Sequence, residues 1–224
     1  MSQQLGFAIE LYLDPALENQ VLKAWNVLAR RQISTHLIEM ESRPHITLFS
    51  APFLEPSKLE SLLKGFASKH DPLPLTFSSL ATFPNDPDNL LFLAPTPSLS
   101  LLHLQSQLCD AIRKEGLEIG DDYAFNSWIP YCSVAHHVPK NRMPEAFSLL
   151  RELKLPVSGY AMDIALVQFS PVREIFSFVL GNNIFYRRLF FAPCPKNMNS
   201  GSRVDGRLRP MKISVRVLDK LGSG

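Results

Sequence analysis

The fold is decided by a short stretch of sequence that occurs twice. Arg43-Pro44-His45-Ile46-Thr47-Leu48 has a counterpart 86 positions later (from 45 to 131), Pro130-Tyr131-Cys132-Ser133-Val134. Each copy follows a proline, alternates polar with apolar residues, and places Thr or Ser two positions after a ring-bearing residue. Side chains of a strand alternate between its two faces. Each copy therefore predicts a strand with one buried face and one polar face.

The elements around the two copies are predicted in the same order, strand–helix–strand–helix–strand. In the first half the strands are expected at 6–13, 45–51 and 73–83, and the helices at 15–32 and 56–69. In the second half the strands are expected at 90–95, 128–138 and 160–169, and the helices at 98–115 and 144–153. A last strand at 174–180 pairs with 160–169. The repeated order predicts a duplicated, bilobal α/β (α+β) fold with a cleft between two pseudo-symmetric lobes.

Composition excludes several classes of protein. The 224 residues are 46% hydrophobic and 20% charged, close to a globular average. No apolar run approaches the ~20 residues of a membrane helix. The N-terminal stretch has no basic region and carries Glu10, unlike a secretory signal. Three cysteines without close spacing indicate a reducing compartment, so we expect a cytoplasmic protein, with the nucleus as an open alternative.

Charge is concentrated at the C-terminal end. Residues 197–224 carry six Lys/Arg against two Asp, a net of +4, whereas the whole chain has a net of +2. The same stretch is rich in Gly and Ser. We therefore divide the chain into a domain at 1–186 and a basic, flexible tail at 187–224. A solvated tail and an electrostatic arm for RNA or a partner are both compatible with this composition.

The polar faces of the two copies carry the chemistry. His45 and Thr47 project from one face of their strand, and a hydroxyl beside an imidazole suits an oxyanion such as phosphate. If the lobes are related by symmetry, Tyr131 and Ser133 face them across the cleft. Three aromatic residues are candidates for stacking on a base, with core packing as the alternative: Phe49, Trp128 and Phe169. The other histidines show no metal-ligand spacing.

The stretches Arg43–Leu48 and Trp128-Ile129-Pro130-Tyr131-Cys132-Ser133-Val134-Ala135 resemble the two-histidine (2H) phosphoesterase superfamily, in particular its 2′-5′ RNA ligase/cyclic phosphodiesterase-like group. The resemblance covers about residues 6–181. It implies a central cleft that acts on 2′,3′-cyclic phosphates or 2′-5′ linkages without a metal or other cofactor. It further implies that His45 is a catalytic acid/base, that Thr47 and Ser133 hold the phosphate, and that the partner is a nucleotide or an RNA phosphate end.

The chain departs from that pattern at one position, where Tyr131 stands in place of the second histidine. A phenol with a reference pKa of about 10 is protonated at pH 7 and is a poor base. Losing one general acid/base typically costs ~10²–10⁴ in rate. His137 lies six residues further along the strand, and His136 is expected on the opposite face unless a bulge intervenes. We expect neither to replace the missing residue.

Three functions remain open. The first is a phosphodiesterase with reduced or altered catalysis, in which His45 is the base and Tyr131 the acid or a phosphate ligand. The second is a nucleotide- or RNA-end-binding protein without turnover. The third is a protein-interaction module, because the helix at 15–32 combines Trp25 with three basic residues in a pattern compatible with calmodulin-type recognition. A core-packing helix with a solvated basic edge is the alternative for that segment.

Overall fold

A seven-stranded sheet organises the residues that the structure, a computed structural model, describes: 6–84, 86–169 and 171–181. These residues all belong to one unit, Met1–Ile184, and the predicted tail at 187–224 lies outside them. The strands are β1 Gly6–Leu13, β2 His45–Ala51, β3 Leu73–Thr82, β4 Leu91–Pro95, β5 Cys132–Ala135, β6 Val157–Phe169 and β7 Arg173–Val179. All their pairings are antiparallel, so the sheet matches the mixed fold expected from the sequence.

The order of the strands shows the duplication. It runs β2-β1-β6-β3-β4-β5, with β7 added beside β6. If each strand of the first half is exchanged for its counterpart (β1 with β4, β2 with β5, β3 with β6), the order reads the same in reverse. The long strand β6 belongs to both halves of the sheet, because β1 pairs with one edge while β3 and β7 share the other. The predicted two-lobed architecture is therefore confirmed.

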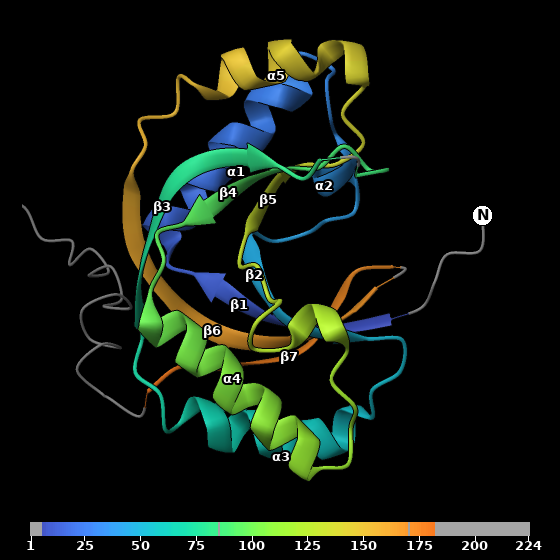
Figure 1. Ribbon diagram of the computed structural model, residues 1–224, viewed down its shortest axis with the longest axis vertical. Helices are drawn as coiled ribbons and strands as arrows, with labels where there is room; N and C mark the ends of the chain where they lie inside the picture. Colours follow the sequence, from blue (N-terminus) through green and yellow to red (C-terminus); the bar gives the residue numbers. More distant parts are fainter. Residues whose placement is uncertain (1–5, 85, 170, 182–224) are drawn as a thin grey trace, which may run out of the picture. The chain divides into compact units, whose positions relative to one another are not determined.

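Helices form two groups on the sheet, as Figure 1 shows. Their bounds are α1 Pro15–Arg30, α2 His36–Glu39, α3 Pro56–Ala67, α4 Leu99–Lys114 and α5 Met143–Leu150, with 3-10 turns η1 Asp121–Tyr123 and η2 Lys140–Arg142. The helices contact strands of the other half: α1 contacts β5 and β6 as well as β1, and α4 follows β4 but contacts β2. Their apolar faces join one continuous core that includes residues of both halves. None of the described helices is long and apolar enough to cross a bilayer.

The structure corrects two expectations. The strand predicted at 128–138 is only four residues long, because Trp128 and its neighbours form a loop that packs onto β2. The helix predicted at 15–32 does not present a calmodulin-type face. Trp25 is 4% exposed and lies with Leu17, Val21 and Leu28 in the core, so the core-packing alternative is the one that the structure shows.

Asp14 joins the start of α1 to the middle of the sheet. One carboxylate oxygen accepts hydrogen bonds from the backbone N–H groups of Ala16 and Leu17, which caps the helix, and the other accepts from the N–H of Tyr160 on β6. The approach leaves no room for a side chain at Gly159. A Cβ there would overlap Asp14 Oδ2 and lie 2.8 Å from Leu17 Cβ. Only glycine, which has no Cβ, fits at position 159 without displacing its neighbours.

We therefore expect Gly159→Ala to lower the free energy of unfolding by about 1–3 kcal/mol, the usual cost of overpacking a core. Gly65→Ala is the matched control, since a Cβ on this residue of α3 meets nothing within 4 Å. That change should stabilise the protein by up to about 1 kcal/mol, because glycine is unfavourable inside a helix. Urea unfolding of the two variants measures both effects, and equal stabilities would contradict the packing described.

Candidate active site

Strands β2 and β5 lie at opposite ends of the sheet order, yet they are in contact (Figure 1). Two indoles hold them there. Trp128 Nε1 donates to the carbonyl of Thr47 at 3.1 Å, and Trp25 Nε1 donates to the carbonyl of Ser133 at 3.0 Å. Thr47 and Ser133 are the equivalent residues of the repeated stretch, so each half fixes the hydroxyl-bearing residue of the other half in the same way.

The interior contact between the two strands involves Cys132. The backbone of His45 hydrogen-bonds the Cys132 thiol, which is fully buried, and burial raises the pKa of this thiol to about 12. The thiol is therefore protonated and lies on the core side of β5. Thr47 and Ser133 alternate with buried residues and are half-buried on the opposite side.

His45 has a defined tautomer. Its Nδ1 lies 2.6 Å from the carbonyl oxygen of Arg43 and 3.4 Å from Glu10 Oε2. A carbonyl oxygen only accepts, so we assign the proton of the neutral ring to Nδ1. Nε2 then carries the lone pair and is the atom that can take a proton from a substrate or a water molecule. The His45 side chain is 18% exposed, so it is partly shielded from solvent.

Glu10 is a candidate functional residue that the sequence analysis missed. It lies opposite Thr47 in the β1–β2 register, close to His45, and its side chain is 4% exposed. Burial raises the pKa of this carboxyl, while the charge of His45 and a hydrogen bond with Tyr12 oppose the rise. A carboxylate behind a histidine stabilises the imidazolium that forms when Nε2 takes a proton. The sequence signal was a single acid inside the apolar strand Gly6–Leu13.

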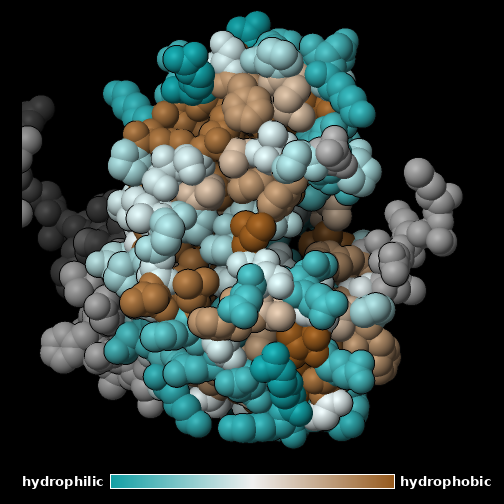
Figure 2. Space-filling model, in the orientation of Figure 1, coloured by the Kyte–Doolittle hydropathy of each residue, from teal (hydrophilic) through white to brown (hydrophobic). Residues whose placement is uncertain are grey.

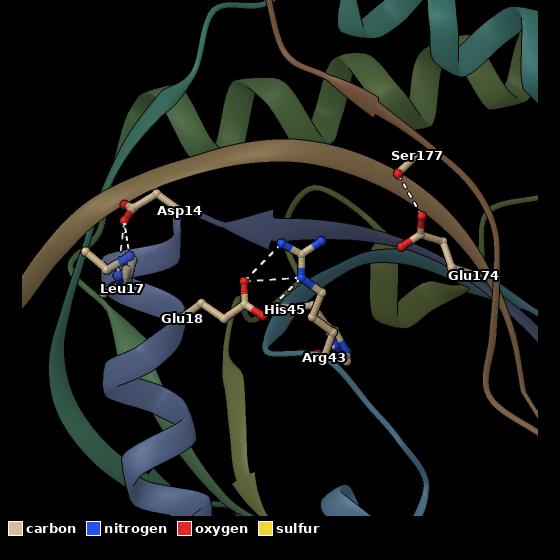
Figure 3. A network of polar contacts seen from close by, with 8 residues as sticks. Asp14, Leu17, Glu18, Arg43, His45, Glu174 and Ser177 are labelled. Atoms are coloured by element: carbon tan, nitrogen blue, oxygen red, sulfur yellow. Dashed lines mark hydrogen bonds and ion pairs between the residues drawn. The ribbon is translucent and has the colours of Figure 1, made fainter. Parts of the chain in front are cut away.

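Arg43 fixes the chain as it enters β2 (Figure 3). Its guanidinium donates to both carboxylate oxygens of Glu18 on α1, at 2.9–3.2 Å, and lies 4.3 Å from the centre of the Tyr12 ring. Because the carbonyl of the same residue accepts from His45, this network transmits the position of α1 to the imidazole. The positive charge of Arg43 is already paired, so we assign it a positioning role.

The surroundings of Tyr131 differ from those of His45 because they are largely aromatic. Its ring packs against Phe83 and Phe92, with ring centres 5.5 and 5.0 Å away. Burial raises the pKa of its hydroxyl, and Tyr123, Asp86 and Asp122 add to the rise. Among the described residues no hydrogen bond joins Tyr131 to His45. That the two groups act on one ligand stays a prediction.

The three predicted stacking residues are not equivalent. Phe49 is 1% exposed and packs edge-on against Tyr123, and Trp128 is 8% exposed with its N–H bonded to Thr47. Both rings serve packing, the alternative that the sequence left open. Phe169 is half-buried beside Val167 at the end of β6. Among the described residues, no group of His, Cys, Asp and Glu is arranged to hold a metal ion.

The surface is unevenly polar. In Figure 2, strongly hydrophilic residues gather toward the two ends of the molecule, whereas the band between them mixes weakly hydrophilic, neutral and apolar residues. This band is where β4 and β5 lie in the same view.

One family of known proteins matches most of the chain. The family model described as the 2′-5′ RNA ligase superfamily matches residues 15–172. A search of curated proteins found no match. Among solved structures, TT0787 of Thermus thermophilus has a TM-score of 0.55 at 14% identity, over 80% of this chain and 100% of that one.

Two crystal structures of E. coli LigT also share the fold. The complex with NADP⁺ has a TM-score of 0.51 at 12% identity, over 81% of this chain and 100% of LigT. The complex with ATP has a TM-score of 0.50 at 12% identity, over 79% and 98%. At these identities the likeness concerns the fold.

Glu10 should make the stability of the protein depend on pH. Its pKa is higher in the folded state than in the unfolded chain, so between the two values the folded state binds more protons and stability falls as pH rises. Gln at this position stays neutral. We therefore expect the wild type to lose stability relative to Glu10→Gln as pH rises from about 4 to 7.

Urea unfolding at a series of pH values measures this difference. Glu60→Gln, on the exposed face of α3, is the control and should follow the wild type throughout. Parallel curves for the wild type and Glu10→Gln would show that Glu10 is not a buried titrating group.

Proposed function

Because the chain belongs to the 2′-5′ RNA ligase superfamily, we propose that it acts on or binds phosphate ends of RNA or nucleotides, with 2′,3′-cyclic phosphates or 2′-5′ linkages as ligands. The observation that carries the proposal is the contact between β2 and β5, the strands of Thr47 and Ser133, whose backbones accept the indole bonds of Trp128 and Trp25. The crystal structures of LigT with NADP⁺ and ATP support a nucleotide as ligand, since LigT has the same fold.

Thr47 and Ser133 are proposed to hold the phosphate. A hydroxyl donates one hydrogen bond, and bonds to a charged oxygen are worth about 1.5–3 kcal/mol each. Two hydroxyls from opposite sides fix two non-bridging oxygens and so orient the phosphorus atom. Their carbonyls are occupied by the indoles, which leaves the side chains as the groups available to a ligand.

His45 is proposed to be the general base. Nε2 takes a proton from a water molecule as the water oxygen forms a bond to phosphorus. One ester P–O bond of the cyclic phosphate breaks, and the leaving oxygen takes a proton from a second group. Glu10 stabilises the imidazolium through Nδ1, 3.4 Å away, and the carbonyl of Arg43 keeps the ring oriented.

Binding without turnover is the second candidate, and Tyr131 is the observation that favours it. A phenol whose pKa is raised by burial stays protonated at neutral pH. Such a group donates a hydrogen bond but does not accept a proton. If the chain offers no other proton-transfer group, the site holds a phosphate end without cleaving it.

We expect His45→Ala to lower the hydrolysis rate of a nucleoside 2′,3′-cyclic phosphate by about 10²–10⁴-fold, the usual contribution of one general acid/base. His103→Ala is the matched control, because His103 is exposed on α4, away from these strands, and the change should leave the rate unaltered. The rates are measured by separating the product monophosphate chromatographically.

A wild-type rate equal to that of His45→Ala would contradict the catalytic proposal. Calorimetric titration with a nucleoside 3′-monophosphate then decides the second candidate. Saturable binding would support a phosphate-end-binding protein, and no binding would reject both functions.

A further inference from the structure

Where β5 pairs with β4, one residue of β5 has no partner on β4. Phe92 is paired with Ser133, but the next residue of β4, Leu91, is paired with Ala135. Val134 therefore has no partner of its own, which is the signature of a β-bulge. Beyond a bulge the alternation of side chains is shifted by one position, so the residues that follow change faces.

The shift moves His136 to the polar side of the strand. Val134 and Ala135 are both buried in the core, 2% and 1% exposed, whereas Ser133 and His136 are half-buried outside it. The sequence analysis expected His136 on the opposite face unless a bulge intervenes, and the register shift is that exception. His137 is exposed instead, with a left-handed φ of 54° and its Nδ1 3.4 Å from Asp88.

His136 directly follows Ala135, the last residue of β5. Its backbone carbonyl accepts a hydrogen bond from Ser34 Oγ at 2.7 Å, which fixes it against the chain before α2. Its ring centre is 5.9 Å from that of His36 and 6.2 Å from that of His137.

These neighbours also set the charge of His136. Burial, and then the charges of His36, His137 and His45, lower the pKa of His136 to about 4, while Asp88 opposes the change. His45 is thus one of the groups whose charge acts on His136. His136 is neutral at pH 7 in the free protein.

Tyr131 lies at the other end of the same strand, where the charges have the opposite sign. Its electrostatic neighbours are Asp86 and Asp122, whose carboxylates would repel a phosphate placed against the hydroxyl. The end of β5 at His136 carries the imidazoles of His36, His136 and His137 beside one carboxylate, Asp88, and imidazoles attract such an anion when they are protonated. The charges therefore favour a phosphate near His136 over one near Tyr131.

We propose that His136, and not Tyr131, is the second proton-transfer residue of the site, opposite His45 across a phosphate held by Thr47 and Ser133. The inference rests on the proposed function. As His45 takes the proton of the attacking water, the P–O bond to one ribose oxygen breaks, and that oxygen takes a proton from the His136 imidazolium. An anionic phosphate between the rings offsets the like charges that keep His136 neutral, so its protonation accompanies substrate binding.

The test compares three variants of the full chain with cytidine 2′,3′-cyclic phosphate as substrate, over pH 4–9. We expect His136→Gln to lower kcat by about 10²–10⁴-fold and to remove one limb of the pH–rate profile. Tyr131→Phe should stay within about threefold of the wild type, far below the loss of a general acid/base. His103→Gln is the matched control, because His103 is exposed on α4 and is not among the groups that act on His136, and both its rate and its profile should be unchanged.

Each other outcome overturns the inference. If Tyr131→Phe loses the activity and His136→Gln keeps it, His136 is not the partner, while the proposed function stands. A rate loss in His136→Gln with an unchanged pH profile would make the role structural. A wild type without turnover would overturn the inference together with the catalytic form of the proposed function.

Discussion

The candidate site depends on the contact between β2 and β5, the first and last strands in the order of the sheet. Trp128, in the loop before β5, donates its indole N–H to the carbonyl of Thr47 on β2, and Trp25 on α1 donates to the carbonyl of Ser133 on β5. A buried carbonyl left without its donor costs about 1–3 kcal/mol, so the first bond opposes separation of β5 from β2 and the second holds α1 on β5. Without this contact the two hydroxyls could not meet one ligand, because the remaining strands stand between them in the sheet.

The helices connect the two halves of the sheet. The helix α1 contacts β5 and β6 as well as β1, and α4 follows β4 but contacts β2. One core therefore runs through both halves. The residues of the candidate site come from both copies of the repeated motif.

Much of the fold could be predicted from periodicity. The strands at 6–13 and 45–51 have the observed bounds, and the helices that begin at Pro15 and Pro56 start where proline and its neighbours indicate. The four-residue helix at His36 was not predicted, because four residues give too short a pattern.

The candidate site was harder to predict, for physical reasons. The bulge at Val134 depends on the pairing of β5 with β4, and no local pattern in the sequence reveals that pairing. The face of His136 could therefore be predicted only with the exception of a bulge. Glu10 was overlooked because its role comes from a residue 35 positions later, His45, which only the β1–β2 register brings close. The indole bonds likewise join residues far apart in the sequence.

The proposed site requires that Thr47 and Ser133 bind the same phosphate. Calorimetric titration of the full chain with inorganic phosphate tests this directly, using the wild type, Thr47→Val, Ser133→Ala and the double variant. We expect one site per chain, with Kd raised about tenfold or more by each single change, as for a hydrogen bond to a charged oxygen. Phosphate affinity that neither change alters would show that the two hydroxyls do not share a ligand, and would rule out the proposed phosphate site.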